Sequence, residues 1–421
     1  MCHHRHRQPH GRFVGSGITV GTIRRSFLVA VAAALVAVGL PGSASAGAQY
    51  PIPNADPFYS AGGDISGVAP GTVLAARQVP NPPNFIGVNT WQLAFRSTAS
   101  EGKPIVGVTT VFVPVVKAPD GPLLSYQQIV NALGLKCAPS QALYSTDPNV
   151  VIRDAAALNV VFQRGWSVAM TDHLGPTSAY GAAKLGGQLT LDGIRAAKNF
   201  DPLQLRNSPV AMAGYSGGGM ATAWAAALAP SYAPELNIVG SAQGGVPMNL
   251  VKMGYLLGED TPHPAFGLVL AAAIGLGREY PDRMPVSENL TPQGTAMMNQ
   301  VANSCTNDIL AVGANHSAAE ITANRSVFQD PEGRRVVEEN SLELYPGIPR
   351  APIFEWHSPT DVLIPVDAID NSTRRYCAAG TPVQTLLTPS PDHLSAALLG
   401  LPAALQWLND RFAGLPAPST C

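Results

Sequence analysis

Apolar and polar positions along the chain form short runs that predict strands alternating with helices. Runs rich in apolar and β-branched residues predict strands at 73–74, 91–96, 105–113, 122–126, 166–171, 209–213, 238–240 and 353–356. Stretches with helical periodicity predict helices at 150–164, 190–199, 220–229 and 396–412. We expect Gly165 to end the first of these helices and Pro230 the third. This alternation predicts an α/β fold with a mainly parallel sheet flanked by helices.

One long segment interrupts the alternation of strands and helices. Residues 246–350 carry mostly helical patterns, and they are too many for an ordinary connection between two core elements. We interpret them as a helical cap inserted between two parts of one core, 47–245 and 351–421. Within this cap, residues 265–277 carry no charge, which favours a buried helix and also suits a lid over a substrate.

The first 46 residues have the pattern of an export signal. Arg24 and Arg25 precede the uncharged run 26–40, and Ala44-Ser45-Ala46 has the small residues of a cleavage site. A retained membrane anchor is the alternative, but the run is short for a membrane-spanning helix. We therefore expect a signal peptide at 1–46, no transmembrane segment after cleavage, and a secreted protein that is free or held at the cell envelope. The paired arginines also fit twin-arginine export.

The composition indicates a globular protein that does not bind nucleic acid. Apolar residues make up 46% of the chain and charged residues 13%, which is unlike a disordered chain. There are 26 basic and 28 acidic residues; residues 1–46 hold five Arg and no acid, so the remainder has 21 basic and 28 acidic residues, a net charge of -7. A chain without basic excess has little affinity for phosphate backbones.

The cysteines that remain after cleavage predict disulfides. They are Cys137, Cys305, Cys377 and Cys421. An even number in an exported chain predicts two bonds, for which three pairings exist. We favour Cys137–Cys305 and Cys377–Cys421, the second of which would hold the C-terminal tail. A metal site is disfavoured, because no two of these cysteines are close in sequence and Asp172-His173 offers only two ligands.

The motif Gly214-Tyr215-Ser216-Gly217-Gly218 is the first candidate for chemistry. It fits G-x-S-x-G, and it lies between a predicted strand and an Ala-rich predicted helix, the setting of a nucleophile elbow. Ser216 is then the nucleophile, and the N–H of Gly217 is one donor of an oxyanion hole. An ordinary glycine-rich turn that happens to contain a serine is the alternative, and it becomes less favoured if an acid and a base follow.

A serine nucleophile needs a histidine base and an acid that orients it. In a fold of this kind the order along the chain is Ser, acid, His. His393 lies just before the last predicted helix, and Asp361 follows a predicted strand end; we interpret them as base and acid. Other candidates are less suitable: Asp367 and Asp370 as solvated helix residues, Asp392 as a sequence neighbour of the base, His357 as a structural residue, and His173 as a loop residue that could line the pocket.

The motifs together resemble the secreted lipase family that includes fungal lipase A and many actinobacterial secreted lipases. The resemblance covers roughly 56–412 and rests on Ser125-Tyr126-Gln127, Cys137-Ala138-Pro139-Ser140, Asp172-His173-Leu174-Gly175-Pro176, the elbow motif, the run 229–236, His357-Ser358-Pro359-Thr360-Asp361 and Asp392-His393-Leu394. It implies an α/β-hydrolase with a helical cap and a triad of Ser216, Asp361 and His393. It also implies hydrolysis of acylglycerols and other carboxylic esters with no metal or cofactor.

The resemblance also implies a second oxyanion donor in the loop after the strand at 122–126. An Asp often stands there in the family, and Asn131 is the nearest match in this chain; a backbone N–H survives that change. Relatives often carry Gln after the serine, where this chain has Gly217.

Several functions are compatible with these residues. The leading hypothesis is a lipase or carboxylesterase that forms an acyl-enzyme, with a lipid ester as substrate at a lipid–water interface and with the apolar cap around the acyl chain. An acyltransferase would use the same triad with an alcohol or sugar acceptor. A peptidase is disfavoured because there are no propeller-like repeats. A lipid-binding protein without catalysis is a third alternative, which would require the loss of a triad residue.

Overall fold

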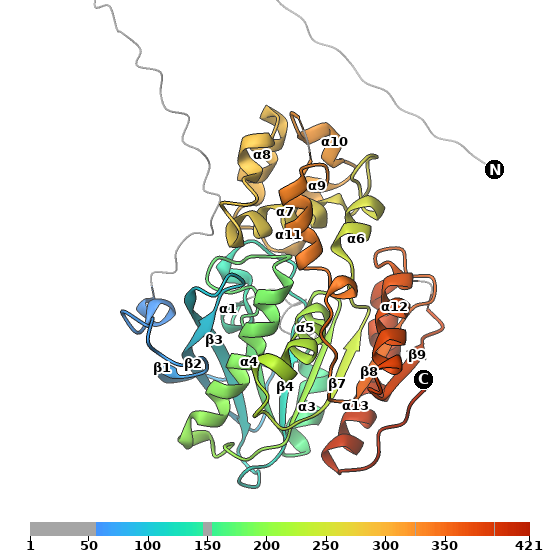
Figure 1. Cartoon of the computed structure of the whole chain (residues 1–421). Helices are drawn as coiled ribbons and strands as arrows, with labels where there is room; N and C mark the ends of the chain where they lie inside the picture. The colour runs from blue at the N-terminus through green and yellow to red at the C-terminus, as the bar shows by residue number, and fades with distance from the viewer. Residues whose placement is uncertain (1–55, 146–153, 325, 391) are drawn as a thin grey trace, which may run out of the picture. The chain divides into compact units, whose positions relative to one another are not determined.

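The computed structural model describes residues 56–145, 154–324, 326–390 and 392–421 (Figure 1). The expected signal peptide at 1–46 lies outside these residues, as does the first part of the helix expected at 150–164. None of the described helices combines the length and the apolar character that a membrane span requires.

Nine strands form one mixed sheet. They are β1 (Val73–Val79), β2 (Val88–Thr98), β3 (Pro104–Pro114), β4 (Leu123–Gln127), β5 (Ser167–Thr171), β6 (Val210–Tyr215), β7 (Ile238–Gly244), β8 (Ile353–His357) and β9 (Val383–Leu387). Their order is β1-β2-β3-β5-β4-β6-β7-β8-β9, and the six strands from β5 to β9 are parallel. The first three strands pair antiparallel, and β3 is antiparallel to β5. The α/β fold with a mainly parallel sheet is confirmed.

Helices cover both faces of this sheet, which explains the nearly continuous apolar character of the central strands. Leu123 and Leu124 of β4 are both buried, but they belong to different apolar clusters because successive side chains point to opposite faces. One cluster contains α4 (Ala183–Asn199), α5 (Gly217–Tyr232) and α12 (Val366–Ala378). The other contains α3 (Ala155–Gln163) and α13 (His393–Phe412).

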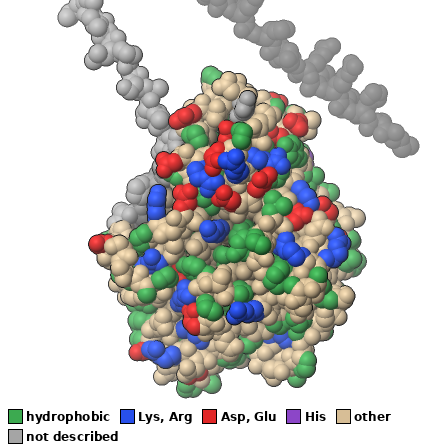
Figure 2. Space-filling view, in the orientation of Figure 1, with side chains coloured by type: hydrophobic (Ala, Val, Ile, Leu, Met, Phe, Trp, Pro, Cys, Tyr) green, Lys and Arg blue, Asp and Glu red, His purple; other side chains and the backbone are tan. Residues whose placement is uncertain are grey.

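The chain between β7 and β8 is helical where the structure describes it. It contains α6 (Leu250–Leu256), α7 (Phe266–Glu279), α8 (Pro292–Val301), α9 (Thr306–Gly313), α10 (Ala318–Ile321) and α11 (Pro331–Glu339). In Figure 1 these helices stand above the carboxyl ends of the parallel strands. Figure 2 shows acidic and basic side chains mixed on this part of the surface, where Arg283 pairs with Glu332 and Glu339. We call residues 246–350 the insertion.

The helix after the serine motif is longer than expected at both ends. It begins at Gly217 rather than Met220 and passes through Pro230 to Tyr232. The three glycines at its start stand in the first turn, where backbone N–H groups have no helical partner in any helix. Pro230 lacks the N–H that would bond to the carbonyl of Ala226, but it lies in the last turn and the helix continues for only two more residues.

Two other helices also begin earlier than expected. α4 starts at Ala183 instead of Thr190, although it contains Gly186 and Gly187. A Cβ on Gly187 would lie 2.9 Å from Trp224 of α5. The two helices pack so closely here that only glycine fits at position 187. α13 starts at His393, because the Asp392 side chain accepts hydrogen bonds from the next backbone N–H groups. The sequence patterns also missed β9 entirely.

Candidate active site

The turn between β6 and α5 carries Ser216 in a strained conformation. Ser216 has φ 54° and ψ −123°, which a residue with a side chain rarely adopts. The turn is tight because a Cβ on Gly218 would lie 2.0 Å from the carbonyl oxygen of Gln127 in β4. The Ser216 N–H donates to the carbonyl of Gly244 at 2.9 Å, which fixes the turn to β7. The side chain of Ser216 therefore stands at the N-terminus of α5, beside its free N–H groups.

Asp361 and His393 form a hydrogen-bonded pair. The Nδ1 of His393 lies 2.6 Å from Oδ2 of Asp361, and both side chains are buried. The other oxygen, Oδ1, accepts hydrogen bonds from the N–H groups of Leu363 and Ile364. The loop backbone thus holds the carboxylate while the carboxylate orients the imidazole. With Nδ1 engaged, Nε2 is the ring nitrogen left for chemistry, and it has no hydrogen-bond partner among the described residues.

Tyr215 connects this pair to the serine turn. Its hydroxyl donates to the backbone carbonyl of His393 at 2.6 Å, and the two ring centroids are 5.0 Å apart. A Cβ on Gly245 would lie 2.8 Å from Cε1 of His393 and 2.6 Å from the Tyr215 ring. The imidazole is thus in contact with the residue directly before Ser216. Sequence reasoning gave Tyr215 no role, although it stands at the first of the two variable positions of the G-x-S-x-G motif.

Asn131 lies against the start of α5. Because β4 and β6 are adjacent parallel strands, the loops after them meet at the same edge of the sheet. A Cβ on Gly217 would lie 2.6 Å from Oδ1 of Asn131, and this oxygen is buried without a hydrogen-bond partner in the described part of the chain. The structure thus brings together Gly217 and Asn131, the two residues expected at the oxyanion hole.

The loop that carries Asn131 is fastened to the insertion. The buried guanidinium of Arg278 in α7 donates to the carbonyl of Leu133 at 2.8 Å and to that of Ala302 at 2.7 Å. A disulfide joins Cys137 to Cys305 across the same contact. The second disulfide joins Cys377 to Cys421 and holds the C-terminal tail near β9. Sequence reasoning missed Arg278, because a single Arg in a helix carries no sign of burial.

Two of the alternative acids, Asp367 and Asp392, have other partners, and so does His357. Asp367 is exposed and pairs with Lys252 at 2.6 Å. Asp392 caps α13 and accepts from the N–H groups of Leu394 and Ser395. His357 is fully buried, and its Nδ1 lies 2.7 Å from Oε2 of Glu355, beneath the loop of Asp361. These contacts leave Asp361 as the acid on His393.

Asp172 and His173 lie at the end of β5 but do not face a common ligand. Asp172 accepts hydrogen bonds from both the N–H and the hydroxyl of Ser140, and burial raises its pKa to about 7. Burial lowers the pKa of His173 to about 4, and neither ring nitrogen has a hydrogen-bond partner among the described residues. Within the described ranges no three His, Cys, Asp or Glu side chains form a group that could hold a metal.

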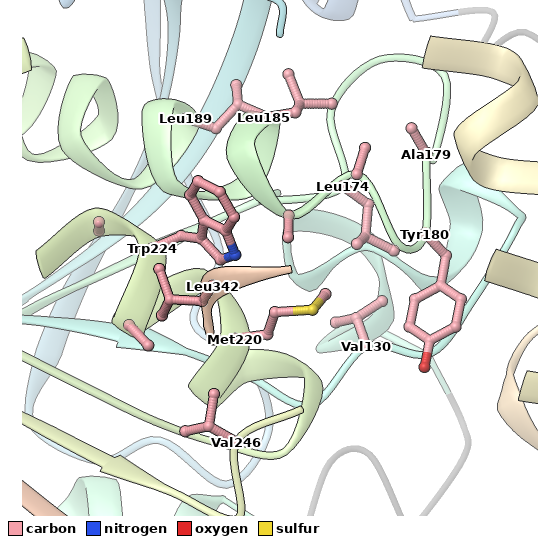
Figure 3. Close-up of a cluster of buried hydrophobic side chains, with 14 of the residues drawn as sticks. Val130, Leu174, Ala179, Tyr180, Leu185, Leu189, Met220, Trp224, Val246 and Leu342 are labelled. Atoms are coloured by element: carbon pink, nitrogen blue, oxygen red, sulfur yellow. The ribbon is translucent and has the colours of Figure 1, made fainter. Parts of the chain in front are cut away.

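An apolar cavity begins one turn into α5. Its volume is about 550 Å³, and its lining comes from Met220, from Tyr180 and from α6, α7 and α11 of the insertion. Figure 3 shows Met220 between Trp224 and Val130, with Tyr180 beyond. Because the N–H of Met220 bonds to the carbonyl of Ser216, the cavity starts within one helical turn of the serine. The lining of this cavity is almost entirely apolar, which suits an apolar ligand better than a charged one.

The chain resembles known lipases along most of its length. The sequence profile of the family described as "Secretory lipase" matches residues 147–420. A secreted triacylglycerol lipase of Malassezia globosa is 33% identical over 391 residues, with 87% of this chain and 81% of the relative covered. The crystal structure of lipase A from Candida antarctica in its closed state superposes with a TM-score of 0.81 at 29% identity, covering 89% of this chain and 91% of the other.

One relative shows that this ancestry does not guarantee activity. A probable inactive lipase of Mycobacterium tuberculosis is 32% identical over 379 residues, with 87% of this chain and 83% of the relative covered. The extent of these matches and the shared α/β-hydrolase fold establish the ancestry, while the activity has to be argued from the residues of the site. The chain belongs to the secretory lipase family.

Proposed function

We propose that this protein is a secreted serine hydrolase that cleaves acylglycerols and related carboxylic esters. The observation that carries the proposal is the hydrogen-bonded pair of Asp361 and His393, in contact with the strained turn of Ser216. A serine, a histidine and an orienting acid in this order are the groups that acyl transfer requires. The name of the Malassezia globosa relative supports the substrate class and the export.

The proposed reaction has two steps. Ser216 attacks the ester carbonyl while Nε2 of His393 takes its proton, and Asp361 stabilises the imidazolium that forms. The N–H of Gly217 and a donor on Asn131 stabilise the oxyanion, and the alcohol leaves with the proton from His393. A water molecule then attacks the acyl-enzyme with His393 again as base, which releases the acid and restores the serine.

We further propose that the insertion is a cap and that its cavity takes the acyl chain. The cavity is almost entirely apolar, and one wall is Met220, one turn from Ser216. An acyl chain that enters between α5 and α7 leaves its ester carbon at the serine. The cap also keeps bulk water away from the apolar part of the substrate.

The first experiment compares the wild-type protein with Ser216→Ala on p-nitrophenyl esters from acetate to palmitate. We expect kcat to fall by roughly 10⁴-fold or more, because the nucleophile is lost. Ser231→Ala is the matched control, since Ser231 lies at the other end of the same helix and its hydroxyl donates to the Leu228 carbonyl. The control should retain the wild-type rate.

A serine-reactive fluorophosphonate separates this proposal from its alternatives. An active hydrolase is labelled at Ser216, and the label is absent from the Ser216→Ala variant. A wild-type protein that is neither labelled nor active would be a lipid-binding protein, like a lipase that has lost its activity. A labelled protein that consumes esters only when an alcohol is added would be an acyltransferase.

A further inference from the structure

The first two turns of α13 expose leucine side chains. Leu394, Leu398 and Leu399 are 63%, 70% and 55% exposed. Leu394 and Leu398 are one helical turn apart and share a side of the helix, and Leu399 stands next to Leu398. Single exposed leucines are common on protein surfaces, but three on adjacent turns form a patch. We call these three residues the leucine surface.

The helix that carries the leucine surface has no charge until its last turn. Its sequence from 393 to 409 contains no Asp, Glu, Lys or Arg. Its inner face is already satisfied, since Ala396, Ala404, Trp407 and Leu408 pack on the sheet. A helix at a water-exposed surface normally carries charged residues on its outer face. In its first two turns α13 is apolar on the buried side and on most of the exposed side, and a helix that is apolar all round is normally covered by another apolar surface.

The apolar surface continues from these leucines toward the active site. Leu394 and Leu398 line a groove of about 1150 Å³ between α13 and α3, and Tyr215 and Trp356 lie in the same lining. Tyr215 directly precedes Ser216, and Leu394 directly follows His393. A partner that binds the leucine surface is therefore held within two helical turns of His393, the proposed base.

We propose that the leucine surface docks the enzyme on an uncharged lipid–water interface, such as the surface of an acylglycerol droplet. This inference rests on the proposed function and adds that the substrate is presented at the surface of a lipid phase. Anionic membranes are disfavoured as partners, because the sequence has no Lys or Arg between Arg375 and Arg411 and residues 47–421 carry a net charge of -7. The leucines enter the apolar phase, and the groove between α13 and α3 then faces the lipid.

The test measures binding without catalysis. Triolein droplets coated with phosphatidylcholine are floated with the full-length Ser216→Ala protein, and the bound fraction is compared with that of the same protein carrying Leu398→Gln and Leu399→Gln. Glutamine keeps the helix propensity of leucine and removes its apolar contact. We expect droplet binding to weaken by about tenfold or more, since each buried leucine contributes strongly to such transfer.

The control carries Ile86→Gln and Val116→Gln, which replace two side chains that are 75% and 86% exposed. They precede β2 and follow β3, at the amino ends of the parallel strands and away from Ser216. We expect the control to float like the parent. With Ser216 present, both double variants should cleave soluble p-nitrophenyl butyrate within about twofold of wild type, as expected for surface changes outside the site.

Three outcomes would overturn the proposal. The first is droplet binding by the leucine variant that equals the control. The second is binding that rises about tenfold when a third of the phosphatidylcholine is replaced by phosphatidylglycerol, since this indicates attraction by charge. The third is a lipid-free dimer in sedimentation that only the leucine variant dissociates, because a second copy then covers this face. None of these measurements depends on ester hydrolysis, so the docking proposal and the proposed function are tested separately.

Discussion

Ser216 is the residue at which backbone strain and chemistry meet. Its positive φ is maintained by neighbours that leave no room for larger residues, as the close approach of Gly218 to Gln127 shows. Strain of this kind persists only where the surrounding structure imposes it. The same turn places the serine, the N–H of Gly217 and the phenol of Tyr215 in one short segment. One short turn therefore supplies several of the groups that the proposed reaction needs.

A prediction at this scale concerns His173 and pH. Its pKa of about 4 in the folded protein lies below the value of 6.5 in an unfolded chain. The unfolded chain thus binds more protons between these values, and the folded protein loses stability as pH falls through this range. His173→Gln does not titrate and keeps a polar side chain of similar length at this position. Between pH 7 and pH 5, the free energy of unfolding of the variant, measured with urea, should rise by about 2 kcal/mol relative to that of the wild type.

Asp172 also makes the stability depend on pH, so the prediction concerns the difference in the free energy of unfolding between His173→Gln and the wild type. Its raised pKa acts in the opposite direction, since the folded state keeps a proton that the unfolded chain loses between its ordinary value and about 7. Both proteins contain Asp172, so its contribution cancels in the comparison. A stability difference that does not change between pH 7 and pH 5 would mean that His173 is not buried as a neutral ring.

At the scale of elements, the two disulfides constrain different parts of the fold. Cys137–Cys305 joins the loop after β4, which carries Asn131, to α9 of the insertion. Cys377–Cys421 joins the end of α12 to the C-terminal tail. Only the first bond, together with Arg278, holds a segment that contacts the serine turn.

Removing each disulfide should therefore have different consequences. Cys137→Ser with Cys305→Ser should lower kcat on p-nitrophenyl butyrate by roughly tenfold or more, because a small displacement of an oxyanion donor is enough to slow the reaction. Cys377→Ser with Cys421→Ser should leave kcat within about twofold. Both pairs should lower the free energy of unfolding by about 2–4 kcal/mol. Equal kcat values for the two double variants would contradict the role given to the loop after β4.

In the molecule as a whole, the core and the insertion have different parts in binding the proposed substrate. The sheet and its loops position Ser216, Asp361 and His393, while the insertion encloses most of the apolar cavity. The cavity wall from the core is Met220 together with the loop at Tyr180. Chain-length preference is therefore expected to depend on α7, which carries none of the three proposed catalytic side chains.

Ala273→Phe tests this division. Ala273 lines the cavity from α7, and a larger side chain would fill space that a long acyl chain needs. We expect kcat/KM for p-nitrophenyl palmitate to fall by about tenfold or more, with the value for the butyrate within about twofold of wild type. Ala319→Phe, at an exposed position of α10, is the control. Equal losses on both esters would place the acyl chain elsewhere.

Local patterns along the chain were enough to predict the class of fold and the candidate catalytic residues. Apolar runs bounded by glycine and proline are short-range signals, and they predicted eight of the nine strands and the helices that separate them. Ser216 was identified because its motif lies between a strand and a helix. Asp361 and His393 were identified because the order of the three residues is characteristic of such a fold. These inferences need only local pattern and order along the chain.

Features that depend on contacts between distant segments could not be predicted from these local patterns. The close approach of Trp224 requires a glycine at position 187 of α4, and the burial of Arg278 depends on carbonyls from three separate segments. The continuation of α5 to Tyr232, the contact of Tyr215 with His393 and the placement of Asn131 against Gly217 are of the same kind. Packing overrides local propensity at such positions, because a close contact between elements is worth more than the preference of one residue.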